Sequence, residues 1–307
     1  MSKNKKNVAL ALASGGPRGF AYIGAIEELE ARGYTISSIA GVSASSLVGG
    51  IYAAGGLQAF KEWLFGLDPM QVVSMMDFAI SKNYLVKGDK VMKAIKERVP
   101  EVNIEDLPIP FCAVATDLYT GEEVVFREGP LFDAIRASIS IPSMFKPAEW
   151  KGRTLVDGGM VNTFPLNRVQ RTPGDILVGF NVNQIDAATI QGFLDSRAAL
   201  VEGRSEKPLL ERIQSTLQEF RLVADGRDEH LPVSASDNYF KILQRSFGIM
   251  NCTISRMGIE LTPPDILVDL PFDTYHGVYG YSHAEEVATV GRQLMAEALD
   301  RYEKKNG

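Results

Sequence analysis

The sequence predicts an α/β fold in which helices cover both faces of a central, mostly parallel sheet. Two observations lead to this prediction. Residues 7–13 are apolar without alternation, as in a strand buried on both faces, and a Gly-rich loop and a helix over about 18–32 follow. A second apolar strand near 37–41 then leads through a tight turn into a helix over about 44–55. This order of elements is typical of a right-handed parallel sheet.

The same criteria place the later elements. Gly33 ends the first helix, because glycine readily adopts the left-handed conformation that follows many helices. Thr120 and Gly121 are typical of a hairpin turn between two strands. A last helix begins at the capping-box pattern that opens with Ser282 and runs to about residue 304. Further strands are predicted at 111–116, 123–126, 154–156, 176–180 and 266–269.

We expect one domain over residues 1–307. Residues 186–245 differ from the rest, being more charged and without evident strands. A helical face there is formed by Leu210, Ile213, Leu217 and Phe220. The block is interpreted as a cap over the site or an oligomer interface, and a helical layer on the sheet is equally compatible.

Charge and cysteine content exclude several classes of protein. The net charge of −6 argues against nucleic acid as a partner, because a phosphate-binding face needs a basic excess. Cys112 and Cys252 have no short paired spacing, which favours free, buried thiols in a reducing compartment and a cytoplasmic location. No cluster of His, Cys or carboxylate residues has metal-ligand spacing, so no metal is expected.

Two segments imitate targeting or membrane signals. Lysines precede an apolar run at residues 8–13 that is shorter than a secretory signal requires, and the run fits a buried first strand. Residues 33–60 carry no charge and are long enough to cross a bilayer. They are rich in Gly and Ser and are interrupted by a turn, so a buried strand–turn–helix and no transmembrane helix are predicted.

The pentapeptide at 41–45, Gly-Val-Ser-Ala-Ser, places Ser43 on a sharp strand-to-helix turn. A serine hydroxyl needs a nearby base to become a nucleophile. The small residues Gly41 and Ala44 let strand and helix approach closely, whereas Ser45 is larger than the usual glycine. The helix N-terminus also favours developing negative charge. The alternative is an ordinary helix start, since Ser is a common N-cap.

The loop at 14–19, Ser-Gly-Gly-Pro-Arg-Gly, supplies backbone amides. The N–H groups of Gly15 and Gly16 are candidates for holding an oxyanion, a role worth about 3–4 kcal/mol per donor. Arg18 adds a positive charge beside them. The alternative is a phosphate-binding loop of a dinucleotide fold. Against it, Ser14 stands at the first glycine of that fingerprint, and the second strand is followed by no acidic residue for a ribose.

Asp157 ends an apolar strand and enters a turn formed by Gly158 and Gly159. Strand ends are where α/β enzymes hold catalytic groups. A desolvated site would raise the pKa of this carboxyl above its usual value of about 3.9 and make it a better base. The alternative is a turn aspartate that bonds its own backbone.

A histidine is the alternative to Asp157 as the base that activates the serine. The order Ser43, Asp157 and then a histidine matches an α/β-hydrolase triad, with two candidates for its third member, His276 and His283. His230 lies in a charged stretch and is expected in solvent.

Together these motifs resemble the patatin-like phospholipases, particularly the bacterial single-domain group. The loop at 14–19, the turn at 41–45 and the Asp-Gly-Gly at 157–159 match that family's motifs. Two further blocks agree, at 115–122 and 136–147. The match spans about residues 7–180 and weakens through the helical block.

The resemblance implies a lipid acyl ester hydrolase of the phospholipase A, lysophospholipase or carboxylesterase type, without a cofactor. It implies a dyad in which Ser43 attacks the ester and Asp157 accepts its proton. The amides of Gly15 and Gly16 would form the oxyanion hole, with Arg18 supporting that loop. A phospholipid or another acyl ester would be the substrate.

Two departures from the family pattern leave another function open. Ser14 and Ser45 replace glycines, and Ser45 adds a hydroxymethyl group where strand and helix pack closely. The runner-up is therefore a catalytically silent lipid-binding or regulatory protein with the same fold. A dense apolar stretch from Phe60 to Phe78 predicts either peripheral contact with a membrane, an acyl pocket, or a helix packed into the core.

Overall fold

The computed structural model describes residues 6–75, 84–185, 191, 239–272, 274–275 and 277–306. Its strands are β1 (Lys6–Leu12), β2 (Tyr34–Val42), β3 (Tyr84–Val86), β4 (Phe111–Asp117), β5 (Glu123–Phe126), β6 (Ser143–Phe145), β7 (Ala148–Trp150), β8 (Arg153–Asp157), β9 (Ile176–Gln184) and β10 (Ile266–Pro271). Its α-helices are α1 (Ala21–Ala31), α2 (Ala44–Ala53), α3 (Leu57–Phe65), α4 (Pro69–Met75), α5 (Asp89–Lys96), α6 (Leu131–Ser138), α9 (Tyr239–Leu261), α10 (Gly277–Ser282) and α11 (Ala284–Asn306). Short 3₁₀ helices are η1 (Gly16–Phe20), η2 (Ile104–Asp106) and η3 (Gly158–Met160).

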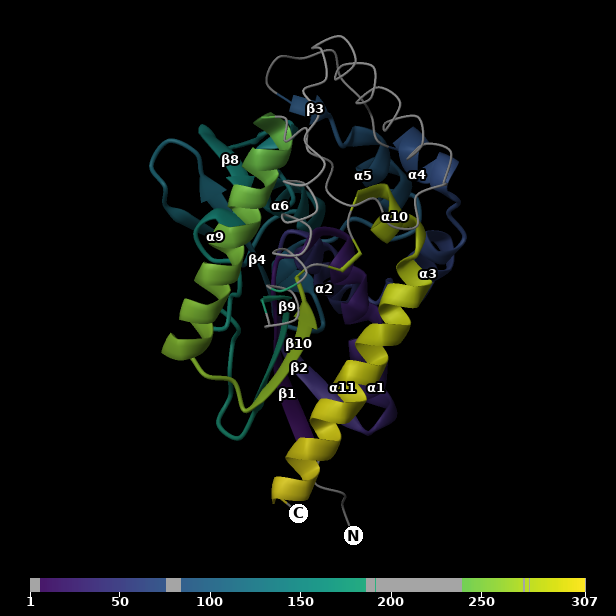
Figure 1. Cartoon of the computed structure of the whole chain (residues 1–307), viewed down its shortest axis with the longest axis vertical. Helices are drawn as coiled ribbons and strands as arrows, with labels where there is room; N and C mark the ends of the chain where they lie inside the picture. Colours follow the sequence, from purple (N-terminus) through teal and green to yellow (C-terminus); the bar gives the residue numbers. More distant parts are fainter. Residues whose placement is uncertain are drawn as a thin grey trace.

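The centre of the molecule is a parallel sheet with strands in the order β10-β9-β1-β2-β4. Helices α1 and α11 cover one face of this sheet, and α9 covers the other (Figure 1). Strand β1 is buried on both faces beyond its first two residues, as its unbroken apolar sequence predicts. The predicted α/β class, with a mostly parallel sheet between helices, is confirmed.

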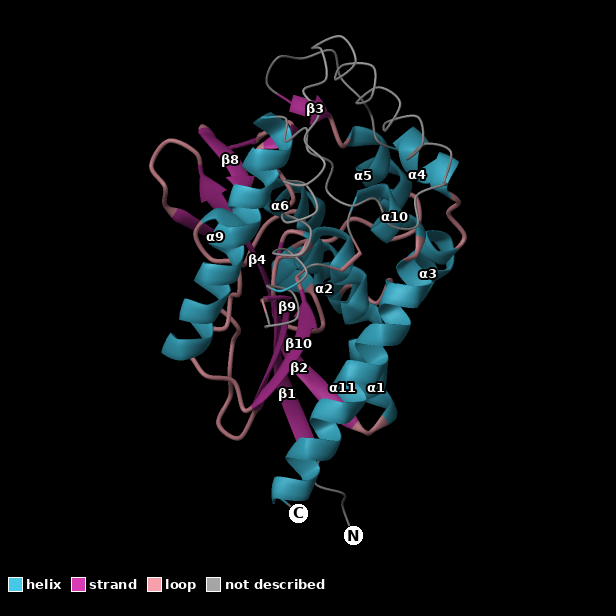
Figure 2. Cartoon of the chain, in the orientation of Figure 1, coloured by secondary structure: helices cyan, strands magenta, loops and turns pink. Residues whose placement is uncertain are grey.

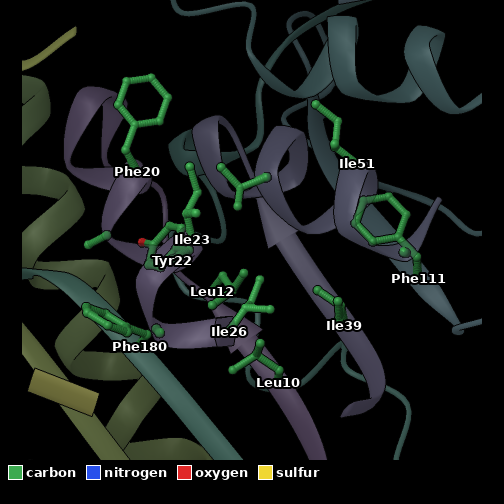
Figure 3. Packing of buried hydrophobic residues seen from close by; sticks show 14 of the residues in the cluster. Leu10, Leu12, Phe20, Tyr22, Ile23, Ile26, Ile39, Ile51, Phe111 and Phe180 are labelled. Atoms are coloured by element: carbon green, nitrogen blue, oxygen red, sulfur yellow. The ribbon is translucent and has the colours of Figure 1, made fainter. Parts of the chain in front are cut away.

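The two faces of β1 differ in side-chain size. Leu10 and Leu12 pack against the helices on the α1 side, together with Tyr22 and Ile26 of α1 (Figure 3). The alanines of the same strand face the opposite layer. Each buried large side chain contributes about 1.5–3 kcal/mol to folding. This core fixes the carboxyl ends of β1 and β2, from which the loops of the candidate site emerge.

The arrangement around β4 places the candidate site. Val114 and Ala115 both pair with β5, which therefore occupies one edge of β4. On the other edge Val114 pairs with Val42 at the end of β2, and Ala115 pairs with Asp157 at the end of β8. Strand β2 runs parallel to β4, and β8 runs antiparallel to it. Strands β2 and β8 therefore run toward each other along the same edge of β4, and their last residues face adjacent residues of β4.

The secondary structure agrees with the sequence in its main elements and differs in detail (Figure 2). The helix predicted over 18–32 is a 3₁₀ turn, η1, followed by α1, and the strand predicted at 37–41 is longer. All five later strands are present, and β4 and β5 form the predicted hairpin. Strands β3, β6 and β7 were not predicted, because three residues are too few to show alternation.

The helical block predicted at 186–245 lies largely outside the described residues. This includes its four apolar positions from Leu210 to Phe220. Helix α9 begins at Tyr239 and overlaps only the end of that block. Among the residues that the structure describes, no helix is long and apolar enough to cross a membrane.

Candidate active site

Ser43 stands on the turn between β2 and α2 in a strained conformation. Its backbone angles are φ 59° and ψ −131°, and a positive φ is uncommon for a serine. Such strain is retained where the surrounding structure fixes it, often at functional sites. A Cβ atom on Gly41 would lie 2.7 Å from the Ser45 carbonyl oxygen, so only glycine fits that position. The turn therefore has the sharp geometry that the pentapeptide predicts.

Ser45 is accommodated inside the turn. Its side chain is fully buried, and its hydroxyl oxygen lies 2.8 Å from both the Leu12 and the Val42 carbonyl oxygens. The same oxygen accepts a hydrogen bond of 2.7 Å from the Val42 N–H. The extra hydroxymethyl group thus bonds the ends of β1 and β2, and Ser43 keeps its strained angles beside it.

Asp157 lies at the end of β8 with 5% of its surface exposed. One carboxylate oxygen, Oδ1, accepts a 2.8 Å hydrogen bond from the Gly159 N–H. The other, Oδ2, is buried and has no hydrogen-bond partner among the described residues. Burial raises the pKa of this carboxyl to about 6, and the Ser43 hydroxyl and the Gly159 amide oppose that rise. Ser43 is the one side chain among the described residues that contributes to this pKa.

Gly158 follows Asp157 at a point of close backbone contact. A Cβ atom there would lie 2.2 Å from the Val114 carbonyl oxygen of β4. The position therefore requires glycine, and the turn packs against β4, the strand with which both β2 and β8 pair.

Two serines of the segment after β5 hold the site together, and pattern analysis of the sequence did not identify them. Ser138, at the end of α6, accepts a 2.8 Å hydrogen bond from the Ser43 N–H and donates one of 2.6 Å to the Val114 carbonyl. The carbonyl of Ser140 accepts a 2.9 Å bond from the Asp157 N–H. Both lie in the block at 136–147, whose resemblance to the family was the one signal that could have found them.

The glycine loop at 14–19 lies beside the turn that follows Asp157, since a Cβ atom on Gly159 would lie 3.1 Å from the Ser14 hydroxyl oxygen. A Cβ atom on Gly15 would lie 2.1 Å from Cγ2 of Val182 in β9, so packing excludes any side chain there. Gly16 adopts a φ of +56°, which favours glycine. Ser14, just before them, donates its N–H to the Thr163 carbonyl at 2.8 Å, and its own carbonyl accepts a 2.7 Å bond from the Asn183 side chain. The loop is thus fixed by backbone and side-chain bonds on both sides.

Arg18 is buried and points toward the C-terminal part of the chain. Its guanidinium donates a hydrogen bond to the Phe272 carbonyl and lies 4.6 Å from the centre of the Phe272 ring. Hydrogen bonding and cation–π contact together fasten the glycine loop to the segment after β10.

Comparison with known proteins identifies the family. Residues 10–169 match the family model described as patatin-like phospholipase. The chain belongs to the patatin-like phospholipase family. It is 33% identical to an uncharacterized NTE family protein of Mycobacterium bovis, over 96% of this chain and 92% of that protein, and equally to one of Mycobacterium tuberculosis.

A fungal relative and a solved structure are more distant. Lysophospholipase NTE1 of Coccidioides immitis is 26% identical over 98% of this chain, which spans 18% of that protein. The crystal structure of VipD from Legionella pneumophila aligns with a TM-score of 0.44 at 12% identity, over 96% of this chain and 67% of that one. Membership of the patatin-like family supports lipid acyl ester hydrolysis as the general activity.

Of the two histidine candidates, His283 lies among the described residues of this patatin-like chain. The Nδ1 atom of His283 is 3.1 Å from the hydroxyl oxygen of Ser282, just before α11. Burial, Ser43 and Gly159 account for the pKa of Asp157, and no described histidine contributes to it. His230 and His276 lie outside the described residues.

The apolar stretch after α2 is divided between core and surface. The side chains of Phe60, Leu64 and Val72 are buried, as expected for helices packed into the core. Met70 is 76% exposed. Met76 and Phe78 lie outside the described residues.

The two cysteines are free and buried, as the sequence predicts. Burial raises the pKa of the Cys112 thiol and of the Cys252 thiol to about 11. In the part of the chain that the structure describes, no group of three or more His, Cys, Asp or Glu side chains is placed to hold a metal ion.

Proposed function

We propose that this protein hydrolyses the acyl ester bonds of lipids through a Ser43–Asp157 dyad. The Ser43 oxygen attacks the ester carbonyl while its proton passes to Asp157. The amides of Gly15 and Gly16 hold the oxyanion. Asp157 then returns the proton to the departing alcohol, which leaves an acyl-enzyme. Water attacks the acyl-enzyme in the same way and releases the fatty acid.

The observation that carries this proposal is the meeting of β2 and β8 along one edge of β4. It brings a strained serine, Ser43, to a buried carboxylate, Asp157, whose pKa of about 6 suits a base near neutral pH. The missing hydrogen bond at Asp157 Oδ2 is compatible with catalysis, because such bonds are often long before substrate binds.

Burial also favours a second candidate, the silent lipid-binding or regulatory protein. Only 2% of the Ser43 surface is exposed, so a bulky ester needs the site to open before it can react. A protein that binds lipid and never releases a fatty acid would fit that closed site. The two candidates differ in one measurable property, which is turnover.

The test is release of fatty acid from a panel of substrates: phosphatidylcholine vesicles, lysophosphatidylcholine and p-nitrophenyl butyrate. The wild type should release acid from at least one, and both Ser43→Ala and Asp157→Asn should lose at least about a thousandfold in kcat, the order seen when a dyad or triad member is removed. Ser46→Ala is the matched control, because the Ser46 hydroxyl donates its hydrogen bond to the backbone carbonyl of Ser43 and not to the carboxylate of Asp157. Lipid binding without turnover by the wild type would establish the silent candidate.

The same assay addresses the triad and the membrane. His283→Ala should keep activity, and a loss as large as that of Ser43→Ala would replace the dyad by a Ser–Asp–His triad. Peripheral membrane contact is proposed from the exposed Met70 and tested by flotation with phosphatidylcholine vesicles. Protein that stays in the soluble fraction would contradict that contact.

A further inference from the structure

The aromatic side chain of Tyr281, in α10, is packed against the glycine loop. Its ring meets the ring of Phe20 edge to face, with centroids 5.8 Å apart and planes at 71°. The residue before it, Gly280, leaves no room for a side chain, since a Cβ atom there would lie 2.8 Å from the ring carbons of Pro17. Both neighbours belong to the segment that begins at Gly16, so the position of the tyrosine relative to this loop is fixed.

The hydroxyl of Tyr281 faces the open side of Gly16. Its oxygen lies 3.9 Å from the point that a Cβ atom on Gly16 would occupy, and apart from the adjacent Gly15 and Pro17 no other described residue is found within 4 Å of that point. At Gly15, by contrast, the corresponding space is filled by Val182. The structure therefore leaves a small space in front of Gly16 with the phenol at its border.

This hydroxyl is also placed among the charges of the site. Burial and the negative charge of Asp157 raise the pKa of Tyr281 to about 12, while the positive charge of Arg18 opposes the rise. Near neutral pH the phenol is therefore uncharged and holds its proton while Asp157 is ionised. Within the described part of the chain, no hydrogen bond engages this hydroxyl. Its proton is free to be donated to a ligand.

We propose that the Tyr281 hydroxyl is a third oxyanion donor, acting with the amides of Gly15 and Gly16. The assignment rests on the proposed function, because it requires a substrate carbonyl in the space in front of Gly16. As the Ser43 oxygen bonds the carbonyl carbon, the carbonyl π electrons move to oxygen, and the negative charge that develops there accepts the phenolic hydrogen bond. The proton stays on the phenol throughout, and the proton of Ser43 goes to Asp157.

The variant Tyr281→Phe tests this role because it removes only the hydroxyl and keeps the ring contact with Phe20. Loss of one oxyanion donor should lower kcat by about a hundredfold to a thousandfold, with kcat/KM falling equally and KM unchanged. The acid limb of the pH profile should stay where Asp157 sets it. Tyr52→Phe is the matched control and should behave as wild type, because its hydroxyl bonds Glu30 on the surface.

Two probes separate an oxyanion donor from other roles. With p-nitrophenyl butyrate the leaving group departs without protonation, so a loss of rate there places the phenol at the carbonyl oxygen. A fluorophosphonate carries its P=O group into the same space, and its rate of reaction with Ser43 should fall by a similar factor.

Several outcomes would overturn the proposal. Wild-type rates in Tyr281→Phe would do so, as would an effect on KM alone, which would assign the phenol to substrate binding. A loss confined to alkyl esters would move it to the leaving group. If the wild type neither hydrolyses an ester nor reacts with the fluorophosphonate, the proposed function fails together with this one. If the wild type is active and only the effect of Tyr281→Phe is missing, the dyad stands without a third donor.

Discussion

Replacing Asp157 with asparagine should stabilise the protein while it removes hydrolysis. A carboxylate that is buried for catalysis is a cost to the folded state, because burial disfavours its charged form. Asparagine has nearly the same shape and stays neutral at every pH. Its carbonyl oxygen can still accept the hydrogen bond that the Gly159 N–H donates to Oδ1.

The size of the effect follows from the pKa. The folded protein raises the pKa of Asp157 from 3.8 to about 6, so it binds the proton more tightly than the unfolded chain does. The favourable contribution of the protonated form is complete below the unfolded pKa and is lost as the pH rises through the folded one. At about 1.36 kcal/mol per pKa unit, the loss is about 3 kcal/mol at neutral pH.

Urea unfolding of the wild type and of Asp157→Asn measures this difference. At about pH 7.5 the variant should be more stable by about 3 kcal/mol, and at about pH 4.5 the advantage should shrink to about 1 kcal/mol. Asp117→Asn is the matched control. The Asp117 carboxylate is also buried, but it accepts hydrogen bonds from the N–H groups of Tyr119 and Thr120, so its replacement should bring no gain.

Two results would refute the reasoning. One is a variant Asp157→Asn that is less stable than the wild type at neutral pH. The other is a difference in stability between the two proteins that is the same at neutral and at acid pH. Such a constant difference would come from a hydrogen bond that the asparagine makes or breaks, because that bond acts at both pH values. Either would mean that desolvation of this carboxyl is not what sets its pKa.

Three further outcomes are expected. The kcat/KM of the wild type should fall about tenfold per pH unit below about pH 6, because protonated Asp157 cannot accept a proton, and a flat profile would contradict this. Ser45→Ala should cost about 1–3 kcal/mol in urea unfolding, because it leaves the buried Val42 N–H without its acceptor; an unchanged midpoint would contradict this. Gly15→Ala should cost about 1–3 kcal/mol by its clash with Val182, and the double variant with Val182→Ala should recover most of that loss, whereas additive losses would exclude the clash.

The local parts of the site could be predicted from the sequence, because each depends on neighbours along the chain. Gly41 and Ser43 indicate a sharp turn after an apolar strand, and Asp157 follows another short strand directly. What brings them together is long-range pairing. Strand β8 arrives antiparallel to β4 and meets the end of β2 on the same edge, and no local pattern encodes that register.

The long-range contacts that hold the site were beyond sequence reasoning for a similar reason. Ser138 binds the Ser43 N–H across 95 residues of chain, and Arg18 reaches Phe272 across 254. Tyr281 comes to the glycine loop from near the other end of the protein. Serine, arginine and tyrosine are common residues, and only the fold shows which of them face a turn or a loop of the site.

The central claim is that Ser43 is an activated nucleophile, and labelling with a fluorophosphonate tests it most directly. Intact and peptide mass spectrometry on the wild type should show one adduct, located on Ser43, with a rate that falls below about pH 6 as Asp157 is protonated. Ser43→Ala should carry no adduct. Absence of any adduct from the folded wild type, or an adduct on Ser45 or Ser46 instead, would contradict the account.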